Sequence, residues 1–385
     1  MTADMAPQTA SLDLEAVRRD FPITRRMIYF NNASIGPLSN RVVSAVTDFL
    51  ADVRDNGRIH YPEWCRTADT EIKSTLARII GAEPSEIAFI KNTTEGLNTV
   101  ANGLDWREGD NVVIADIEYP SNVYPWMNLR RRGVDIKWLR TDNGRIIPEG
   151  LRACIDRRTR IVSLSAVQFF NGFRLDIDAV GSICREKGVL LNLDAIQYIG
   201  ALDLNLADLQ VDFLSAGGHK WLLGPIGTGI FYCRQGSLDR LHPSVVGYHS
   251  VDKSEDHMDY DLTFRDGAAR FEEALVNFPG IWGLKAAADT LLETGTKKIE
   301  AQILDVTKHA SESLLSRGYE ILSPQAEEER SGILSFRHSK VSPQALNDRL
   351  SAAKIETAVR GGGVRLSPSF YNTIDEIDAM LDALP

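Results

Sequence analysis

The sequence predicts an α/β protein whose large domain contains a mainly parallel, seven-stranded type of sheet flanked by helices, followed by a smaller α+β domain. Three observations predict this fold. Apolar runs of strand length alternate with helical patterns between residue 66 and about residue 235, an order that requires crossovers between parallel strands. Two long helical stretches then precede short strands after about residue 280. With 385 residues, the chain is long enough for two domains.

The large domain is predicted from alternating helical and strand patterns, with no internal repeat. Four stretches have apolar residues at helical spacing: 66–80, 94–102, 121–131 and 177–187. Short apolar runs predict the strands: 87–90, 112–115, 135–139, 161–165, 189–193, 211–214 and 230–233.

The small domain is predicted from the last third of the chain. Helical patterns occupy 281–294, 297–317, 343–353 and 375–384, and short strands occupy 332–336 and 357–360. We therefore expect an amino-terminal segment, 1–35, that joins the small domain, a large cofactor-binding domain over 36–275, and the small domain over 276–385.

Composition narrows the classes of function. The net charge of −10 disfavours nucleic acid or an anionic membrane as the main partner. No apolar run is long enough to span a membrane, and residues 1–5 lack the features of a signal peptide. The four cysteines are scattered, without zinc-binding spacing, so we expect no metal and reduced thiols in a cytoplasmic protein.

An acid and an amine each follow one of the predicted strands. Asp194 ends one strand, and Lys220 follows the next after Gly217-Gly218. The carboxyl ends of parallel strands meet at one sheet edge, where ligands bind in open α/β folds. Singly, such a lysine is usually solvated and such an aspartate usually caps a helix. Together they suit pyridoxal phosphate (PLP), whose aldehyde forms a Schiff base with a lysine and whose ring nitrogen pairs with a carboxylate.

Two other classes of protein compete with this interpretation. A nicotinamide-dependent dehydrogenase is also α/β, but no Gly-x-Gly-x-x-Gly follows the first strand. A non-catalytic binding protein that keeps the fold stays open. It is disfavoured because Asp194, Gln197, His219 and Lys220 are all present.

Six segments in order resemble one family. The chain resembles fold-type I PLP enzymes of the class V aminotransferase group, which includes cysteine desulfurases and isopenicillin N epimerase-like proteins. The segments that carry the resemblance are Tyr29-Phe30-Asn31-Asn32-Ala33-Ser34, Asn92-Thr93-Thr94-Glu95-Gly96, Asp194-Ala195-Ile196-Gln197, Gly218-His219-Lys220-Trp221, Arg270-Phe271-Glu272 and Arg365-Leu366-Ser367-Pro368.

The resemblance implies residues that bind the cofactor. Thr93 and Thr94, at a helix start, and His219 would hold its phosphate. Tyr119 would stack on the pyridine ring and act in catalysis with Asp194 and Lys220. Gln197 would bond the phenolic oxygen. The resemblance also implies a homodimer in which Asn277 reaches the phosphate in the partner subunit.

It also implies how a substrate is bound. Arg365 would grip the α-carboxylate in a bidentate contact, and Asn32 is expected among the substrate-binding residues. Arg360 would share this task or bind a second acidic group, or it would simply pair with a nearby acid.

Departures from the family pattern limit the choice of reaction. Desulfurases carry a nucleophilic cysteine on a loop, whereas only Gly361-Gly362-Gly363-Val364 separate Arg360 from Arg365 here. Tyr119 replaces a desulfurase histidine, and Phe169 replaces an asparagine. We therefore expect an aminotransferase or α,β-lyase acting on an amino acid or amine through a Lys220 Schiff base. The alternative is an epimerase or a cysteine desulfurase-like C–S lyase that lacks the loop cysteine.

Overall fold

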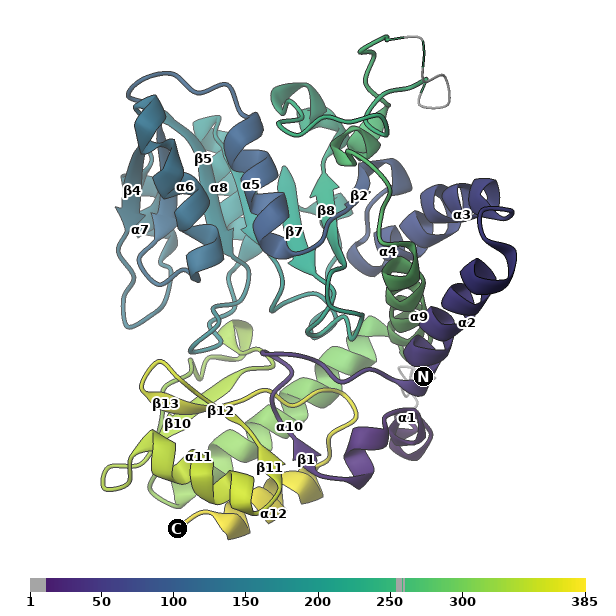
Figure 1. The fold of residues 1–385 in the computed structure, drawn as a ribbon. Helices are drawn as coiled ribbons and strands as arrows, with labels where there is room; N and C mark the ends of the chain where they lie inside the picture. Colours follow the sequence, from purple (N-terminus) through teal and green to yellow (C-terminus); the bar gives the residue numbers. More distant parts are fainter. Residues whose placement is uncertain (1–11, 254–257, 259) are drawn as a thin grey trace, which may run out of the picture.

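A seven-stranded sheet forms the centre of the large domain in the computed structural model, which describes residues 12–253, 258 and 260–385 (Figure 1). Its strands lie in the order β2, β8, β7, β6, β5, β3, β4. Their bounds are β2 (Ile87–Phe89), β3 (Asn111–Ala115), β4 (Asp135–Leu139), β5 (Thr159–Ser165), β6 (Leu190–Asp194), β7 (Phe213–Gly217) and β8 (Gly229–Cys233). Neighbours from β7 to β4 are parallel, and β8 is antiparallel to β7 and β2. The predicted fold class is confirmed.

The two faces of this sheet pack against different helices. Val112 and Ile114 of β3 belong to the core cluster that includes residues of α5 (Thr93–Gly103) and α6 (Tyr124–Asn128). Val113 and Ala115 belong to the cluster that includes residues of α7 (Pro148–Cys154) and α8 (Ile177–Lys187). Since both faces are covered, the strands are continuously apolar rather than alternating, which is why their sequences were recognisable.

Two predicted helices are interrupted in the structure. The stretch 66–80 is divided between α3 (Tyr61–Thr67), the π-helical η2 (Ala68–Ile72) and α4 (Lys73–Ile80). The stretch 121–131 is broken into η4 (Pro120–Asn122), α6 and η5 (Leu129–Arg132), and Pro120 and Pro125 each stand at the start of a short segment. A proline lacks the amide hydrogen that a continuous helix would need, so each segment restarts at its proline.

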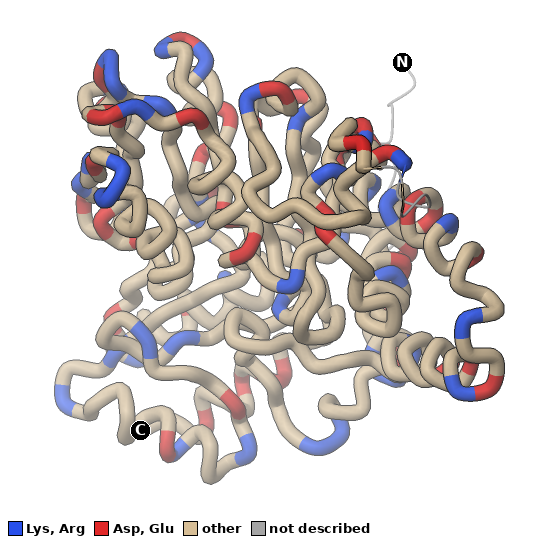
Figure 2. The backbone as a smooth tube through the Cα atoms, turned by 45° about the horizontal axis from the view of Figure 1, so that its top comes forward, with Lys and Arg blue, Asp and Glu red and all other residues tan. Residues whose placement is uncertain are grey.

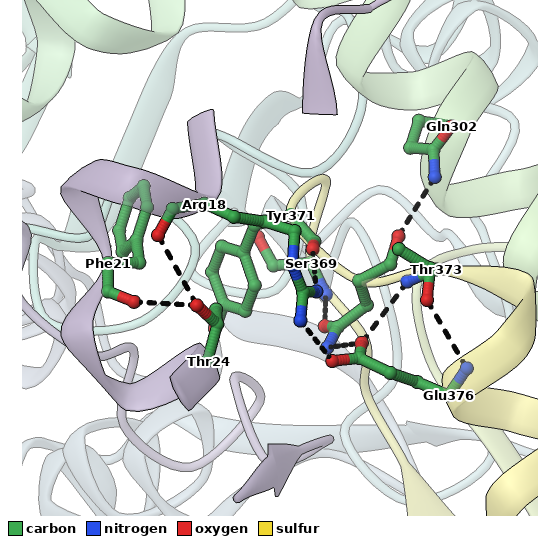
Figure 3. Close-up of polar contacts among 9 residues, drawn as sticks. Arg18, Phe21, Thr24, Gln302, Ser369, Tyr371, Thr373 and Glu376 are labelled. Carbon is green, nitrogen blue, oxygen red and sulfur yellow. Dashed lines mark hydrogen bonds and ion pairs between the residues drawn. The ribbon is translucent and has the colours of Figure 1, made fainter. Parts of the chain in front are cut away.

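The amino-terminal segment packs against the carboxyl-terminal part of the chain (Figure 3). Arg18 of α1 (Leu14–Asp20) forms an ion pair of 2.8 Å with Glu376 of α12 (Ile374–Ala383) and donates a hydrogen bond of 2.7 Å to the carbonyl of Tyr371. Strand β1 (Ile28–Tyr29) then pairs in parallel with β11 (Ile355–Glu356). These contacts join the amino-terminal segment to the small domain.

The small domain has a four-stranded antiparallel sheet in the order β12, β13, β10, β9. Its elements are β9 (Glu320–Ile321), β10 (Leu334–Arg337), β12 (Ala358–Arg360), β13 (Gly363–Leu366), α10 (Thr296–Ser316), α11 (Pro343–Ala352) and α12. Helix α9 (Phe278–Thr294) instead packs on α2 (Asn40–Asn56) and α4 beside the large domain (Figure 1). The division near residue 276 stays a prediction.

The remaining elements are short 3₁₀ segments, and the surface is mixed in charge. The 3₁₀ segments are η1 (Pro22–Arg25), η3 (Pro84–Glu86), η6 (Leu206–Asp208), η7 (Gln235–Arg240), η8 (Gly267–Phe271) and η9 (Glu327–Glu329). Figure 2 shows basic and acidic residues interspersed along the outer loops and helices. No helix in the described parts of the chain is long and apolar enough to cross a membrane.

Candidate active site

A cavity of about 500 Å³ lies at the carboxyl ends of the parallel strands. Residues that follow β3, β5, β6 and β7 line it from the large domain, and residues of β12 and β13 line it from the small domain. Sequence-predicted site residues that line it are Thr93, Thr94, Tyr119, Asp194, Gln197, His219, Lys220, Arg360 and Arg365.

The half-buried side chain of Lys220 lines this cavity. Its Nζ lies 5.8 Å from the centroid of the Tyr119 ring and makes no hydrogen bond or ion pair with any residue that the structure describes. Burial lowers the pKa of Lys220; nearby Asp194 opposes this shift, and the positive charges of Arg365 and Arg360 add to it. A lowered pKa gives the neutral, nucleophilic amine that covalent and base catalysis require.

A glycine allows the backbone to pass close to this lysine. A Cβ on Gly36 would lie 2.2 Å from the Lys220 carbonyl oxygen, and the Gly36 amide donates a hydrogen bond of 2.8 Å to the carbonyl of His219. A larger residue at Gly36 would therefore displace Lys220 itself.

Asp194 stands at the end of β6 with its carboxyl group lining the cavity. Its Oδ1 accepts a hydrogen bond of 3.1 Å from the amide of Ile196. Burial raises the pKa of Asp194, and the carboxylate of Glu118 adds to this rise. A cationic partner would offset the cost of charging this buried group.

Gln197 is held between two other parts of the chain. Its Nε2 donates to the carbonyl of Ala33 at 3.0 Å, and its Oε1 accepts from Nε1 of Trp221 at 2.8 Å. A primary amide has two N–H groups, so one remains for a ligand in the cavity.

The amino terminus of α5 forms one end of the cavity. Asn92 caps it, with Oδ1 accepting from the amide of Glu95 at 3.0 Å. Thr93 Oγ1 accepts from the amide of Gly217 at 2.9 Å, and Thr94 Oγ1 donates to Ser121 Oγ at 2.8 Å. The first amides of a helix lack internal partners and, with the helix dipole, attract anions. Neither Asn92 nor Ser121 was predicted as a site residue, although Asn92 lies in one of the segments that resemble the family.

These residues fit PLP. The chain provides a half-buried lysine amine with no hydrogen-bond partner among the described residues, a buried carboxyl group and a helix amino terminus with hydroxyl groups around one cavity. They match the aldehyde, ring nitrogen and phosphate of the cofactor respectively.

Arg365 of β13 lines the cavity from the small domain and is buried, with only 2 % of its surface exposed. Its Nη1 donates to the carbonyl of Phe169 at 2.7 Å, and its Nη2 donates to Ser34 Oγ at 2.9 Å. In the described part of the chain, no acid pairs with it and its Nε has no hydrogen-bond partner. Burial, assisted by the charge of Arg360, lowers the pKa of Arg365 to about 10. Sequence reasoning missed Ser34, although the quoted amino-terminal segment contains it.

Asn32 and Asn277 do not line the cavity in this chain. Asn32 is buried, with Nδ2 donating to the carbonyl of Ser367 at 2.9 Å and Oδ1 accepting from the Tyr371 hydroxyl at 2.8 Å. The side-chain amide of Asn32 therefore joins the segment that follows β1 to Ser367 and Tyr371 of the small domain. Asn277 caps α9 and donates a hydrogen bond of 3.3 Å to the carbonyl of Gly227, beside a separate hollow of about 260 Å³.

A tight hairpin joins Arg360 to Arg365. Gly361 and Gly362 have φ values of 55° and 80°, and Arg360 pairs directly with Gly363 across the hairpin. Positive φ at both central residues defines a turn for which glycine is strongly preferred. A Cβ on Gly361 would also lie 2.7 Å from the ring of Phe170. Gly361 and Gly362 thus form the turn, and Gly363 already belongs to β13.

The cysteines lie away from this hairpin. None of the four, all of which belong to the described residues, lines the cavity. Burial raises the pKa of the thiols of Cys154, Cys184 and Cys233, which keeps them protonated near neutral pH.

Comparison with known proteins defines the class. The model of the family "Aminotransferase class-V" matches residues 28–380, so the chain belongs to this family and is a PLP-dependent enzyme. The chain is 34 % identical to a probable cysteine desulfurase of Methanothermobacter thermautotrophicus, over 96 % of this chain and 97 % of that protein. It is 26 % identical to a cysteine desulfurase of Haloferax volcanii, over 97 % and 96 % of the respective chains.

Solved structures have the same fold. An apo cysteine desulfurase from Thermococcus onnurineus superimposes with a TM-score of 0.88 at 27 % identity, covering 98 % of both chains. A cystine C–S lyase in complex with its product cysteine persulfide superimposes with a TM-score of 0.88 at 24 % identity, covering 94 % of this chain and 98 % of that one.

Proposed function

We propose that this protein is a PLP-dependent α,β-lyase that removes a substituent from the β-carbon of an α-amino acid without using an enzyme thiol. The observation that carries this proposal is Arg365, a buried guanidinium that lines the same cavity as Lys220 without an acidic partner in the described chain. An unpaired buried charge is costly, and a substrate carboxylate would offset that cost.

The residues of the cavity would have two kinds of role, binding and proton transfer. PLP, when bound, withdraws electrons from the bonds at the α-carbon of an amino acid. Lys220 would bind the cofactor and then move the α-proton at its Nζ, which a lowered pKa favours. Asp194 would keep the ring nitrogen of PLP protonated. Gln197 would donate a hydrogen bond to the phenolic oxygen. The start of α5 and His219 would hold the phosphate.

Tyr119 and Phe169 shape the space above the cofactor. Their rings meet edge to face with centroids 5.1 Å apart, and the Phe169 carbonyl also orients Arg365. Tyr119 would supply a flat surface for the pyridine ring, in place of the histidine of desulfurases. The ring of Phe169 would exclude water from the reacting atoms.

The hairpin favours elimination over sulfur transfer to the enzyme. Transfer requires a thiolate near the substrate sulfur. The turn at Gly361 and Gly362 carries no thiol, and the described cysteines lie outside the cavity. The relatives named as cysteine desulfurases and a cystine C–S lyase support a carbon–sulfur bond as a candidate for cleavage. With cysteine and water, elimination would yield pyruvate, ammonia and hydrogen sulfide in equal amounts.

Product analysis tests this proposal. The PLP-loaded protein is incubated with single amino acids, with and without an added keto acid as amino acceptor. A lyase releases keto acid and ammonia together without the acceptor. Keto acid formed only with the acceptor would identify an aminotransferase, and inversion of the α-carbon without either product would identify an epimerase; both results contradict the proposal.

We also infer that the active enzyme is a homodimer. Ile226 lines the cavity yet is 69 % exposed, and Leu275, beside Asn277 in the neighbouring hollow, is 56 % exposed. A second copy that covers these side chains would remove apolar surface from water. It would also bring Asn277 near the partner's phosphate-binding residues.

A further inference from the structure

We propose that the cavity selects α-amino acids whose short side chain carries a second anionic group, and that Arg360 binds this group. The inference rests on the proposed function only in taking an α-amino acid as the substrate. The chemical class of ligand is a small molecule with two anionic groups, such as a dicarboxylate or an amino acid with a carboxylate or sulfur oxyacid side chain.

The guanidinium of Arg360 faces the cavity and has no acidic partner among the described residues. Arg360 is the last residue of β12 and is exposed. Its Nη1 donates a hydrogen bond of 2.9 Å to the carbonyl of Val359, its own neighbour in the chain. Within the described ranges, no carboxylate forms an ion pair with it, whereas exposed Arg337 on β10 pairs with Glu320 at 2.7 Å. The alternative that Arg360 simply pairs with a nearby acid is therefore not observed among these residues.

The strand register places Arg360 and Arg365 on one face of the hairpin. Arg360 lies opposite Gly363, and Arg365 lies opposite Ala358. Side chains two residues apart on a strand share a face, so the two arginines are diagonal neighbours with Cα atoms about 7–8 Å apart. Two arginines that share a face at this Cα spacing and line one cavity suit a ligand with two anions separated by a short carbon chain.

The charges of the cavity leave Arg360 without a role in holding the cofactor. Among the described lining residues, the cations are Lys220, Arg360 and Arg365, and the carboxylate is Asp194. Lys220 and Asp194 would be engaged by PLP, and the phosphate would lie at the start of α5. The α-carboxylate would be bound by Arg365. Arg360 remains, and its charge lowers the pKa of both Lys220 and Arg365, a repulsion that a second anion would relieve.

The short turn gives this second anion room. A Cβ on Gly362 would meet no atom within 4 Å, so the hairpin tip borders open space. A longer loop in this place would cover Arg360. The short turn at Gly361 and Gly362 therefore carries no thiol and also leaves the Arg360 guanidinium exposed.

Binding of matched ligands to the holoenzyme tests the inference. Calorimetry would compare succinate with butyrate, which has the same number of carbon atoms and one carboxylate. We expect wild-type protein to prefer succinate by about tenfold or more, and Arg360→Gln to lose this preference while its affinity for butyrate is unchanged. Arg337→Gln, which removes an exposed arginine outside the cavity, serves as the matched control and should keep the preference.

The outcomes separate this inference from the proposed reaction. An unchanged preference in Arg360→Gln, or equal weakening of both ligands, would overturn the role of Arg360. Failure of both ligands to bind wild-type protein would overturn the role of Arg360 together with carboxylate binding at Arg365. A negative lyase assay alongside an Arg360-dependent preference for succinate would refute the proposed reaction and leave the substrate class standing.

Discussion

Arg365 donates a hydrogen bond of 2.9 Å to the hydroxyl of Ser34, although 331 positions separate the two residues in the chain. The same guanidinium donates to the carbonyl of Phe169, which follows β5 in the large domain. The proposed carboxylate-binding group is thus oriented by the amino-terminal segment and by the large domain, while it belongs to the small domain. The site is complete only when these three segments meet.

Replacing Arg365 by lysine tests this orientation. A lysine ammonium is a point charge and cannot reproduce two parallel hydrogen bonds to a carboxylate. One charged hydrogen bond contributes about 1.5–3 kcal/mol, so kcat/KM in Arg365→Lys should fall about 10–100-fold. Steady-state kinetics measure the change, with Arg337→Lys as control. Equal loss in the control, or no loss in Arg365→Lys, would remove Arg365 from the substrate site.

The Schiff-base residue is identified by reduction and peptide mapping. Borohydride treatment of the yellow holoenzyme should fix the pyridoxyl group on Lys220, because this amine lines the cavity and has a lowered pKa. Lys220→Ala should lose the label and turnover. Label on Lys91, an exposed lysine near the start of α5, would show that the cofactor binds elsewhere.

The pH dependence of cofactor loading reports on the charges around Lys220. Only the neutral amine attacks the cofactor, and burial lowers the pKa of Lys220, so loading should reach half its maximal rate below pH 10.4, about the usual lysine value. Arg360 contributes to this lowering. Arg360→Gln removes that charge, which raises the pKa and moves the midpoint to higher pH. Stopped-flow absorbance measures the midpoint; a shift to lower pH would contradict this electrostatic account.

Sedimentation tests the inferred dimer. At micromolar concentration the protein should sediment with about twice the mass of one chain. Leu275→Glu places a charge on the exposed apolar surface and should favour the monomer. A wild-type monomer that binds PLP tightly would exclude a cofactor-binding role for Asn277 of the partner subunit.

The fold was predictable because the central strands are apolar on both sides. β4 and α8 have the predicted bounds, and Asp194 and Lys220 could be placed at one sheet edge because β6 and β7 are parallel. Helix α2 was not predicted, although Val42, Val46, Phe49 and Val53 recur at helical spacing in its sequence.

The site was less predictable where contacts depend on tertiary structure. The bond between Ser34 and Arg365 joins distant segments, and the contact from Arg365 to Phe169 uses a backbone carbonyl that no side chain reveals. Asn32 lies in a quoted segment, but the fold directs its amide toward Ser367 and Tyr371. A local sequence pattern indicates which residues approach a site, but not which way each side chain points.

The most direct test of the account is a variant in which all four cysteines, Cys65, Cys154, Cys184 and Cys233, are replaced by serine or alanine. Keto acid and ammonia release is measured for this variant and for wild-type protein, with PLP content determined by absorbance. A thiol-free lyase predicts that the variant retains wild-type turnover per bound PLP. Loss of sulfur release after a single cysteine substitution, with PLP still bound, would contradict the account and indicate a desulfurase that uses an enzyme thiol.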